Sequence, residues 1–295
     1  MKVLITGGSG QIGEGFLTDL QSFLPDVSSR TYLTVLTHNN PIKLGPHRSI
    51  RVNFIDRVEG YFDVAIHLAA IINTPFCQKP ENRDLVLKTN VGLTKTVCEH
   101  TDFVVLLSTD NVFKGVEGRE LREDDMPDPC NFYGISKMEA ENVVTTHDGA
   151  VVRVQTMLGC RNILTTAIID TIRGKPHLPF WNDTYSRPSF LLDLAKTLKV
   201  LLECRTGGIY HCSTTGDVFS RADIAKRVLS FFSEHNLSCQ IDAISEEPCS
   251  VPAFPRYLVL NSDSTRQRLG VEFSSSSRTL RHHLEKLLLT SGRRM

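Results

Sequence analysis

Three glycines at a fixed spacing, Gly7, Gly10 and Gly13, follow a short apolar run at the start of the chain and precede a helical pattern. Each suits a strand that turns directly into a helix. Gly7 can take the tight turn, Gly10 lets the backbone approach a ligand closely, and Gly13 lets the helix pack against the strand. The first N–H groups of such a helix lack intrahelical partners and attract phosphate. The segment TGGSGQIG therefore predicts a site for the pyrophosphate of a dinucleotide.

Strand and helix patterns alternate after this loop. Strand-like apolar runs lie at residues 3–5, 32–36, 51–54, 64–68, 103–107 and 150–154, and helical patterns lie between them at residues 13–23, 85–100 and 133–145. Alternation of this kind is typical of a parallel sheet with right-handed crossovers. We predict an α/β fold with a Rossmann-type doubly wound parallel sheet, in which ligands bind beyond the carboxyl ends of the strands.

The regularity weakens after residue 156. Helical patterns remain at residues 162–173 and 220–233, but aromatic and proline-rich connectors separate them. We therefore predict a dinucleotide-binding domain over residues 1–156 and a smaller, mainly substrate-binding lobe over residues 157–295. Within the second part, a segment of about residues 187–215 is expected to return to the first domain.

Composition and charge argue against several classes of protein. The 33 Lys and Arg residues balance the 33 Asp and Glu residues, so no net field favours nucleic acid or an anionic membrane. No apolar stretch approaches the roughly 18 residues of a membrane helix, and the first residues lack the pattern of a signal peptide. The eight cysteines form no CxxC pair, which indicates reduced thiols rather than disulfides or a zinc site. We expect a cytoplasmic protein that binds no metal.

The end of the second predicted strand bears on which dinucleotide is preferred. A carboxylate there would bind the adenosine ribose hydroxyls of NAD, but this chain has Thr37, His38 and Asn39, with Lys43 close by. Small polar side chains near cations suit the 2′-phosphate of NADP(H), which we predict as the preferred cofactor, with NAD(H) as the alternative. Asp56 follows the third strand, where it would either bind the adenine amine or cap a turn.

Later motifs follow the glycine loop in a characteristic order. They are HLAA (67–70), Asn90, STD (108–110) and YGISK (133–137). Together they resemble the extended short-chain dehydrogenase/reductase family. Within that family, STDNVFKG (108–115), EDDMPDPCNFYGISKMEAE (123–141), RPSFLLDLA (187–195) and PRYLVLNSDSTRQRLG (255–270) are most similar to dTDP-4-dehydrorhamnose reductases and their relatives. The resemblance covers nearly the whole chain.

The resemblance implies which residues bind the cofactor. The pyrophosphate would be held by Gly7, Gly10, Gln11, Ile12 and Gly13, and the cofactor would be lined beyond the fourth strand by Leu68, Ala69 and Ala70. Asn90 would stabilise the architecture of the site. Without the family pattern, the two alanines would be interpreted as strand-end packing and Asn90 as a polar residue inside a helix.

The resemblance also implies a catalytic triad of Thr109, Tyr133 and Lys137. Reduction of a ketone places negative charge on its oxygen, so the site needs an acid and a hydrogen-bond donor there. Tyr133 is the predicted acid. Lys137 lies one helical turn further on, where its ammonium is expected to lower the pKa of Tyr133 and to hold the nicotinamide ribose. Thr109 would donate its hydroxyl to the substrate carbonyl.

The residue after Asp110 separates related reactions. Nucleotide-sugar 4,6-dehydratases of this family carry Thr-Asp-Glu, whereas this chain has Asn111, which cannot take up a proton in an elimination. The resemblance therefore favours NADPH-dependent reduction of the 4-keto group of a nucleotide-linked 4-keto-6-deoxy sugar. Two alternatives stay open. One is a non-catalytic, cofactor-binding regulator like the beta subunit of methionine adenosyltransferase, and the other is a nucleotide-sugar epimerase.

Contacts with the nucleotide sugar are harder to assign. Asp110 and Asn111 follow Thr109 directly, and Trp181 and Arg187 lie in the connector that the family uses to frame the substrate. Trp181 would stack on a base or sugar and Arg187 would pair with a phosphate, although a buried Trp and a surface Arg are equally good interpretations. The family commonly pairs two copies through helices that correspond to residues 85–100 and 133–145, so a homodimer is an open alternative.

Overall fold

A parallel sheet of seven strands forms the centre of the computed structural model, which describes residues 1–18, 32–37, 48–51, 58–160, 181–234 and 254–291. The strand order is β10-β6-β5-β4-β1-β2-β3, and every pairing within it is parallel. The strands are β1 (Lys2–Thr6), β2 (Tyr32–Thr37), β3 (Arg48–Arg51), β4 (Val64–His67), β5 (Val104–Thr109), β6 (Ala150–Val154) and β10 (Gly208–Cys212). The predicted doubly wound α/β fold is confirmed.

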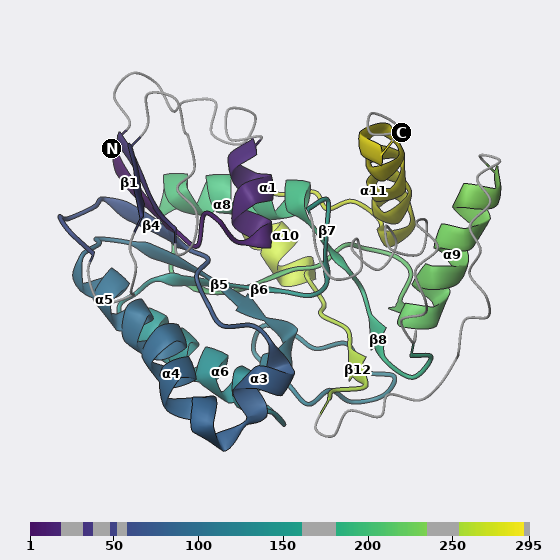
Figure 1. Cartoon of the computed structure of the whole chain (residues 1–295), viewed down its shortest axis with the longest axis horizontal. Helices are drawn as coiled ribbons and strands as arrows, with labels where there is room; N and C mark the ends of the chain where they lie inside the picture. The colour runs from purple at the N-terminus through teal and green to yellow at the C-terminus, as the bar shows by residue number, and fades with distance from the viewer. Residues whose placement is uncertain (19–31, 38–47, 52–57, 161–180, 235–253, 292–295) are drawn as a thin grey trace.

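Helices cover both faces of this sheet (Figure 1). On one face lie α1 (Gln11–Thr18) and α8 (Leu191–Cys204), and on the other lie α4 (Arg83–Leu87), α5 (Leu93–Glu99) and α6 (Phe132–Thr146). Side chains alternate along a strand, so each strand contributes to both cores. In β1, Val3 and Ile5 pack in the α1 and α8 core, whereas Leu4 packs in the α5 and α6 core.

The predicted helix at residues 85–100 is interrupted. Its middle forms a π-helical turn, η2 (Lys88–Gly92), which joins α4 to α5. Such turns occur often at functional sites. The predicted strand at residues 103–107 ends later, at Thr109, and the third strand covers Arg48–Arg51. Residues 52–54 of that prediction, and the helix predicted at residues 162–173, lie outside the described residues.

A second group of elements lies beside the carboxyl ends of the large sheet (Figure 1). It contains a small sheet in the order β11-β8-β12 and the long helices α9 and α11. The elements are β7 (Met157–Leu158), β8 (Tyr185–Ser186), β9 (Ser189–Phe190), β11 (Phe219–Ser220), α9 (Arg221–Glu234), β12 (Tyr257–Leu258) and α11 (Ser276–Ser291). Helix α10 (Asp263–Leu269) instead packs against β10 and α8. Three short elements complete the first part: α3 (Thr74–Gln78), η1 (Pro80–Asn82) and η3 (Asp110–Val112). The helix predicted at residues 220–233 corresponds to α9.

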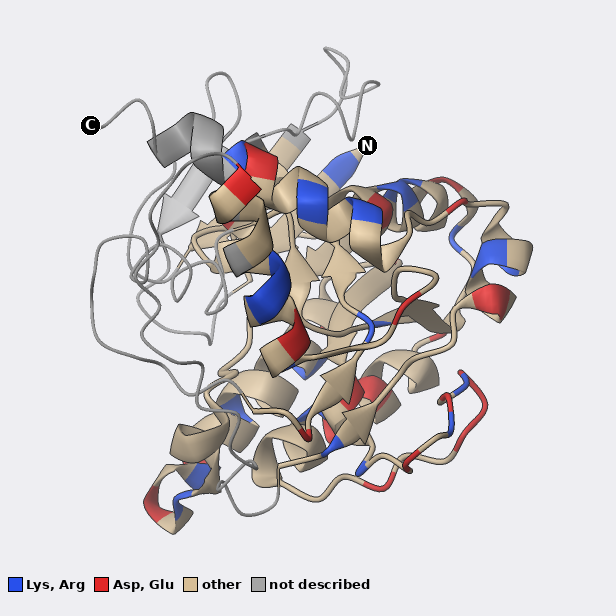
Figure 2. Cartoon of the chain, turned by 90° about the vertical axis from the view of Figure 1, so that its right-hand side faces the viewer, with Lys and Arg blue, Asp and Glu red and all other residues tan. Residues whose placement is uncertain are grey.

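Charged residues of both signs are interspersed along the helices and loops (Figure 2). No helix in the described part of the chain is long and apolar enough to cross a bilayer. Within the same residues, no group of three or more His, Cys, Asp or Glu side chains is arranged to hold a metal ion.

Candidate active site

The glycine loop lies at the position where the strand order reverses, because β1 pairs with β2 on one side and with β4 on the other. Gly7 has a φ of +73°, and a Cβ there would lie 2.7 Å from the backbone nitrogen of Ala69. A Cβ on Gly13 would overlap the carbonyl oxygen of Gly7. Both positions therefore require glycine. Gly10 closes the turn by donating its N–H to the Gly7 carbonyl at 2.9 Å.

A dinucleotide fits this end of the sheet. Helix α1 begins at Gln11, so the N–H groups of Gln11, Ile12 and Gly13 are in its first turn, where no intrahelical acceptor exists. At the end of β2, the buried Oγ1 of Thr37 has no hydrogen-bond partner among the described residues. A buried hydroxyl without a partner is costly unless a ligand supplies one. His38, Asn39 and Asp56 lie outside the described residues.

The segment after β4 lines the same edge. Leu68, Ala69 and Ala70 are all half-buried, and the N–H of Ala69 donates to Thr6 Oγ1 at 3.2 Å. Asn90, in the π-helical turn, fixes the next residue of this segment. Its Oδ1 accepts from the Ile71 N–H at 2.7 Å, and its Nδ2 donates to the Ile71 carbonyl at 3.1 Å and to Ser136 Oγ at 2.9 Å. Asn90 thereby connects the segment after β4 to α6.

The three predicted catalytic residues converge at the ends of β5 and α6. Asn131 caps α6, because its Oδ1 accepts from the Gly134 N–H at 2.8 Å, and this places Tyr133 in the first turn. Thr109 is the last residue of β5, and its side chain is hydrogen-bonded to that of Tyr133. Lys137 lies one turn further along α6, where its Nζ donates to the Leu107 carbonyl at 2.8 Å. Thr109, Tyr133 and Lys137 are all buried.

The electrostatics of Tyr133 differ from the sequence prediction. Burial raises the pKa of its phenol above the ordinary value, the hydrogen bond with Thr109 opposes that rise, and the charges of Asp110 and Cys77 add to it. The prediction that Lys137 lowers this pKa overall is therefore wrong for this arrangement. Desolvation of the phenolate dominates, and the Lys137 ammonium is turned to the Leu107 carbonyl. Tyr133 is consequently a neutral phenol at neutral pH, the form that can donate a proton.

Asp110 and Asn111 extend the site from Thr109. The buried Asp110 carboxylate accepts from Thr109 Oγ1 at 3.0 Å, from Asn111 Nδ2 at 2.9 Å and from Gln155 Nε2 at 3.3 Å. Burial raises the pKa of Asp110, while these hydrogen bonds lower it. Asn111 also accepts from Asn131 Nδ2 at 3.2 Å, so it is fixed against the start of α6. Both predicted substrate residues thus adjoin Thr109, and both are engaged with protein groups.

Trp181 lies in an aromatic cluster of the second group of elements. Its ring meets Phe254 edge-on, with 5.2 Å between the centroids, and the Arg221 guanidinium lies 4.6 Å from the centre of the indole. Its carbonyl accepts from the Ala222 N–H at 3.1 Å, which anchors the connector to the start of α9. Trp181 is half-buried, so part of its surface is available to a ligand.

Arg187 is committed to the protein. Its Nε donates to the Gly216 carbonyl at 3.1 Å, its Nη1 to the Leu260 carbonyl at 3.4 Å and its Nη2 to Glu120 Oε1 at 2.6 Å. This pairing lowers the pKa of Glu120. All three guanidinium nitrogens donate to oxygen atoms of the chain, and the phosphate contact stays a prediction. Arg187 holds three separate segments together.

We expect Arg187→Met to lower the free energy of unfolding by about 1–3 kcal/mol, because the carbonyls of Gly216 and Leu260 lose a charged donor. Chemical denaturation measures this change. Arg119→Met is the matched control, since Arg119 is half-exposed in a surface pair with Asp125 and should change stability by less than about 1 kcal/mol. A tenfold rise in the KM for a nucleotide sugar, with stability unchanged, would instead support the predicted phosphate contact of Arg187.

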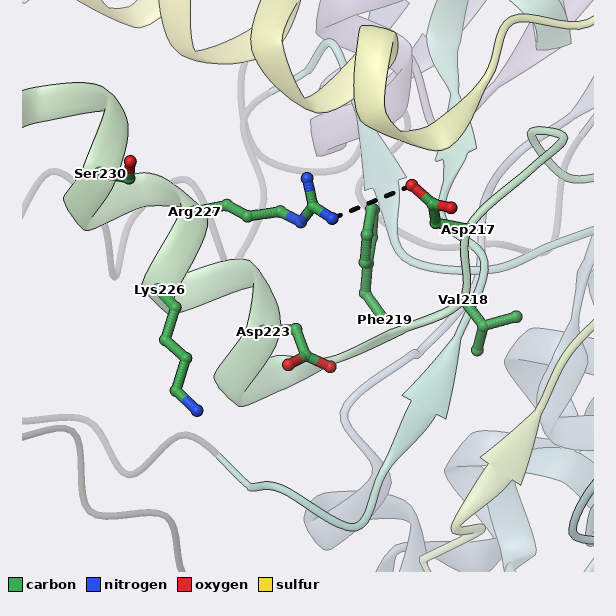
Figure 3. A pocket seen from close by; sticks show the side chains of 7 residues that line it. All are labelled: Asp217, Val218, Phe219, Asp223, Lys226, Arg227 and Ser230. Carbon is green, nitrogen blue, oxygen red and sulfur yellow. Dashed lines mark ion pairs between the residues drawn. The ribbon is translucent and has the colours of Figure 1, made fainter. Parts of the chain in front are cut away.

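A pocket of about 540 Å³ lies between α9 and the segment that precedes it (Figure 3). Arg227 projects from α9 toward Asp217, and the two side chains form an ion pair of 3.9 Å. The same guanidinium lies 4.6 Å from the centre of the Phe219 ring. None of the predicted catalytic residues lines this pocket, so the site chemistry is located elsewhere.

Gln155 was not singled out by the sequence, although it joins the two groups of elements. Its Nε2 donates to Asp110 and to the Leu258 carbonyl, and its Oε1 accepts from Ser213 Oγ at 3.1 Å and from the Leu260 N–H at 3.3 Å. A lone glutamine after a strand carries no motif, so only the tertiary structure reveals this role. Cys77, which packs against Tyr133, was missed for the same reason.

Comparison with known proteins identifies the family. A family model described as the RmlD substrate binding domain matches residues 1–289. The chain belongs to this family. Among curated relatives of the chain, the spore coat polysaccharide biosynthesis protein SpsK of Bacillus subtilis is 27% identical over 295 residues and covers 97% of each chain. A dTDP-4-keto-6-deoxy-D-glucose reductase of Streptomyces niveus is 25% identical, over 56% of this chain and 58% of its own.

Another relative of this RmlD-family chain is not named for sugar reduction or polysaccharide biosynthesis. Methionine adenosyltransferase 2 subunit beta of Xenopus laevis is 26% identical, over 86% of this chain and 78% of its own.

Solved structures agree on the fold. The dTDP-4-dehydrorhamnose reductase of Bacillus anthracis in complex with NADP has a TM-score of 0.76 at 21% identity, covering 97% of this chain and 98% of its own. UDP-glucuronic acid 4-epimerase of Bacillus cereus in complex with UDP-glucuronic acid and NAD has a TM-score of 0.81 at 18% identity, covering 98% and 100%. At these identities the likeness shows the Rossmann-type fold alone.

Proposed function

We propose that this protein is a reductase that uses NADPH to reduce the 4-keto group of a nucleotide-linked 4-keto-6-deoxy sugar. The observation that carries the proposal is the buried cluster of Thr109, Tyr133 and Lys137 at the same edge of the sheet as the glycine loop. Membership of the RmlD substrate binding domain family and the similarity to a dTDP-4-keto-6-deoxy-D-glucose reductase support this choice of reaction and substrate class.

Each residue of the cluster has a part in this reaction. The nicotinamide cofactor, held by the glycine loop and the segment after β4, supplies the hydride. Tyr133 donates its phenolic proton to the carbonyl oxygen of the substrate, because burial keeps that phenol protonated. Thr109 turns its hydroxyl from Asp110 Oδ1 to the same oxygen and stabilises the charge that develops there. Lys137 holds the nicotinamide ribose and orients the cofactor.

NADPH is our choice of cofactor because no carboxylate follows Thr37, and a carboxylate at this position would bind the ribose hydroxyls of NAD. The NADP bound to the reductase of Bacillus anthracis supports this choice. Elimination is disfavoured because the residue after Asp110 is Asn111, whose side-chain amide does not titrate and cannot act as a second acid or base. The amide donates to the Asp110 carboxylate at 2.9 Å.

The test is loss of NADPH absorbance when a panel of dTDP-, UDP-, GDP- and CDP-linked 4-keto-6-deoxy sugars is added to the purified protein. We expect turnover with at least one of them, and slower turnover when NADH replaces NADPH. A protein that binds NADPH tightly but reduces no member of the panel would contradict the proposal. Comparison of the turnover rates of the dTDP- and UDP-linked substrates also shows which nucleotide the protein prefers.

A regulatory subunit is the second candidate, and the similarity to methionine adenosyltransferase 2 subunit beta over 86% of this chain supports it. A regulator would bind NADPH without turnover and would copurify with an adenosyltransferase. The intact proton donor at Tyr133 and the hydroxyl at Thr109 favour the reductase, because a protein that only binds the cofactor needs neither for chemistry.

A further inference from the structure

A buried ion pair lies one helical turn beyond Lys137. Glu141 follows Lys137 by four residues on α6, so the two side chains share one face of the helix. The Glu141 carboxylate accepts from Arg153 Nε at 3.0 Å and from Arg153 Nη2 at 2.7 Å, and also from Ser108 Oγ at 2.5 Å. Arg153 is fully buried. The pair therefore fastens α6 to β5 and β6 directly behind the site.

The ion pair continues away from the site as a chain of hydrogen bonds. Arg153 Nη1 lies 3.4 Å from His211 Nε2, and His211 Nδ1 lies 3.0 Å from the Asn261 carbonyl. Burial, followed by the charge of Arg153, lowers the pKa of His211 to about 3, so the imidazole is neutral. A neutral ring that accepts at Nε2 and donates from Nδ1 satisfies both contacts.

Lys137 is buried. On α6 it lies between Tyr133 and Glu141, on β5 it donates to the Leu107 carbonyl, and its charge acts on His67 of β4. Burial and then the charge of Lys137 lower the pKa of His67 to about 3, so this ring is neutral as well. Burial lowers the pKa of Lys137 to about 8, and the Glu141 carboxylate opposes that fall. Glu141 is thus the negative charge that keeps the buried ammonium protonated.

We propose that Glu141 is a positioning residue for the reductase, whose buried carboxylate, held by Arg153 and Ser108, maintains the positive charge of Lys137 and thereby sets the upper limit of the pH range for cofactor binding and turnover. This inference rests on the proposed function, because the charge of Lys137 matters only when a cofactor binds beside it. Arg153 acts through Glu141, since it contacts the carboxylate and not the lysine.

The charged form of Lys137 is the form that binds the cofactor, and this determines the direction in which Glu141 shifts the pH dependence of NADPH affinity. A lysine whose pKa is about 8 is charged below that pH and loses its charge as the pH rises through it. Without the Glu141 carboxylate the pKa of Lys137 falls further, so affinity for the cofactor is lost at a lower pH. At acidic pH the variant and the wild type should behave alike.

The test is the pH dependence of NADPH affinity, measured by fluorescence titration from pH 6 to pH 10. We expect Glu141→Gln to lower the pH at which affinity is lost by about one unit, which is about a tenfold loss of affinity above that pH. Glu139→Gln is the matched control, because Glu139 lies exposed on the same helix and should keep the wild-type profile. An unchanged profile for Glu141→Gln would overturn the proposal.

A double variant separates the carboxylate from its partner. Glu141→Gln combined with Arg153→Gln removes both charges, and replacing both members of a buried pair is tolerated better than removing one. We expect the double variant to fold and to retain the lowered pH limit. Recovery of the wild-type limit would show that an unpaired Arg153 causes the shift, and would overturn the proposal. The measurement of NADPH affinity requires no sugar substrate. It therefore tests the role of Glu141 even when the protein reduces none of the nucleotide sugars.

Discussion

Replacement of Tyr133 by Phe should reduce turnover of the nucleotide sugar by about 10²–10⁴-fold, which is the usual contribution of a positioned general acid. The substitution removes one hydroxyl and leaves the buried ring in its contacts with Cys77 and Val86. NADPH affinity should change by less than about threefold, because the glycine loop and Lys137 are untouched. Stopped-flow measurement of NADPH oxidation, together with a fluorescence titration of NADPH, checks both expectations.

Tyr210→Phe is the matched control for this substitution. Tyr210 lies on β10 and is also buried. Its hydroxyl donates to the carbonyls of Thr206 and Gly207, just before β10, at 3.1 Å and 3.3 Å. Loss of this hydroxyl should lower stability by about 1 kcal/mol without changing kcat. Equal losses of activity in the two variants would contradict the role of Tyr133 as the proton donor and would point to stability alone.

The sequence predicted those parts of the site that depend on local structure. The glycines of the loop are required by backbone geometry, and the strand before them and the helix after them follow from local periodicity. Tyr133 and Lys137 share a helix face because their spacing fits one helical turn. These features are set by neighbours along the chain, so one sequence is sufficient to recognise them.

Other properties of the site depend on which distant residues meet. The direction of the pKa shift of Tyr133 was predicted wrongly, because the sequence shows Lys137 four residues away but not the burial that dominates. The contacts of Arg187 could not be predicted, because the carbonyls of Gly216 and Leu260 and the carboxylate of Glu120 are far from it in the chain. Long-range contacts of this kind carry no local pattern.

The two kinds of information combine in α6. The sequence places Tyr133, Lys137 and Glu141 at intervals of four residues, and the structure shows what each position meets: a hydroxyl at the end of β5, a carbonyl within β5, and an arginine on β6. The helix therefore connects the proton donor to a fixed internal charge. We therefore expect kcat to depend strongly on the position of α6 relative to β5.

Gly134→Ala tests that position directly, and we expect it to lower kcat by about 10²-fold. A Cβ on Gly134 would overlap the carbonyl oxygen of Asn111 and lie 2.9 Å from Pro129 Cβ, so the start of α6 must move away from the end of β5. Such a movement separates the hydroxyls of Tyr133 and Thr109, and a displacement of about 1 Å at a reacting centre costs rate on this scale. Steady-state kinetics with NADPH at saturation measures the loss.

Gly92→Ala provides the control for Gly134→Ala. A Cβ on Gly92 meets no atom closer than 3.9 Å, so the same added methyl group should leave kcat unchanged and should not lower the free energy of unfolding. NADPH affinity of Gly92→Ala should be close to that of the wild type, because Gly92 lies in neither the glycine loop nor α6. The displaced α6 of Gly134→Ala also carries Lys137, so its kcat is compared only at saturating NADPH. A Gly134→Ala protein with wild-type kcat would show that the distance between α6 and β5 does not limit the reaction, and that Tyr133 reaches the carbonyl oxygen from a displaced helix.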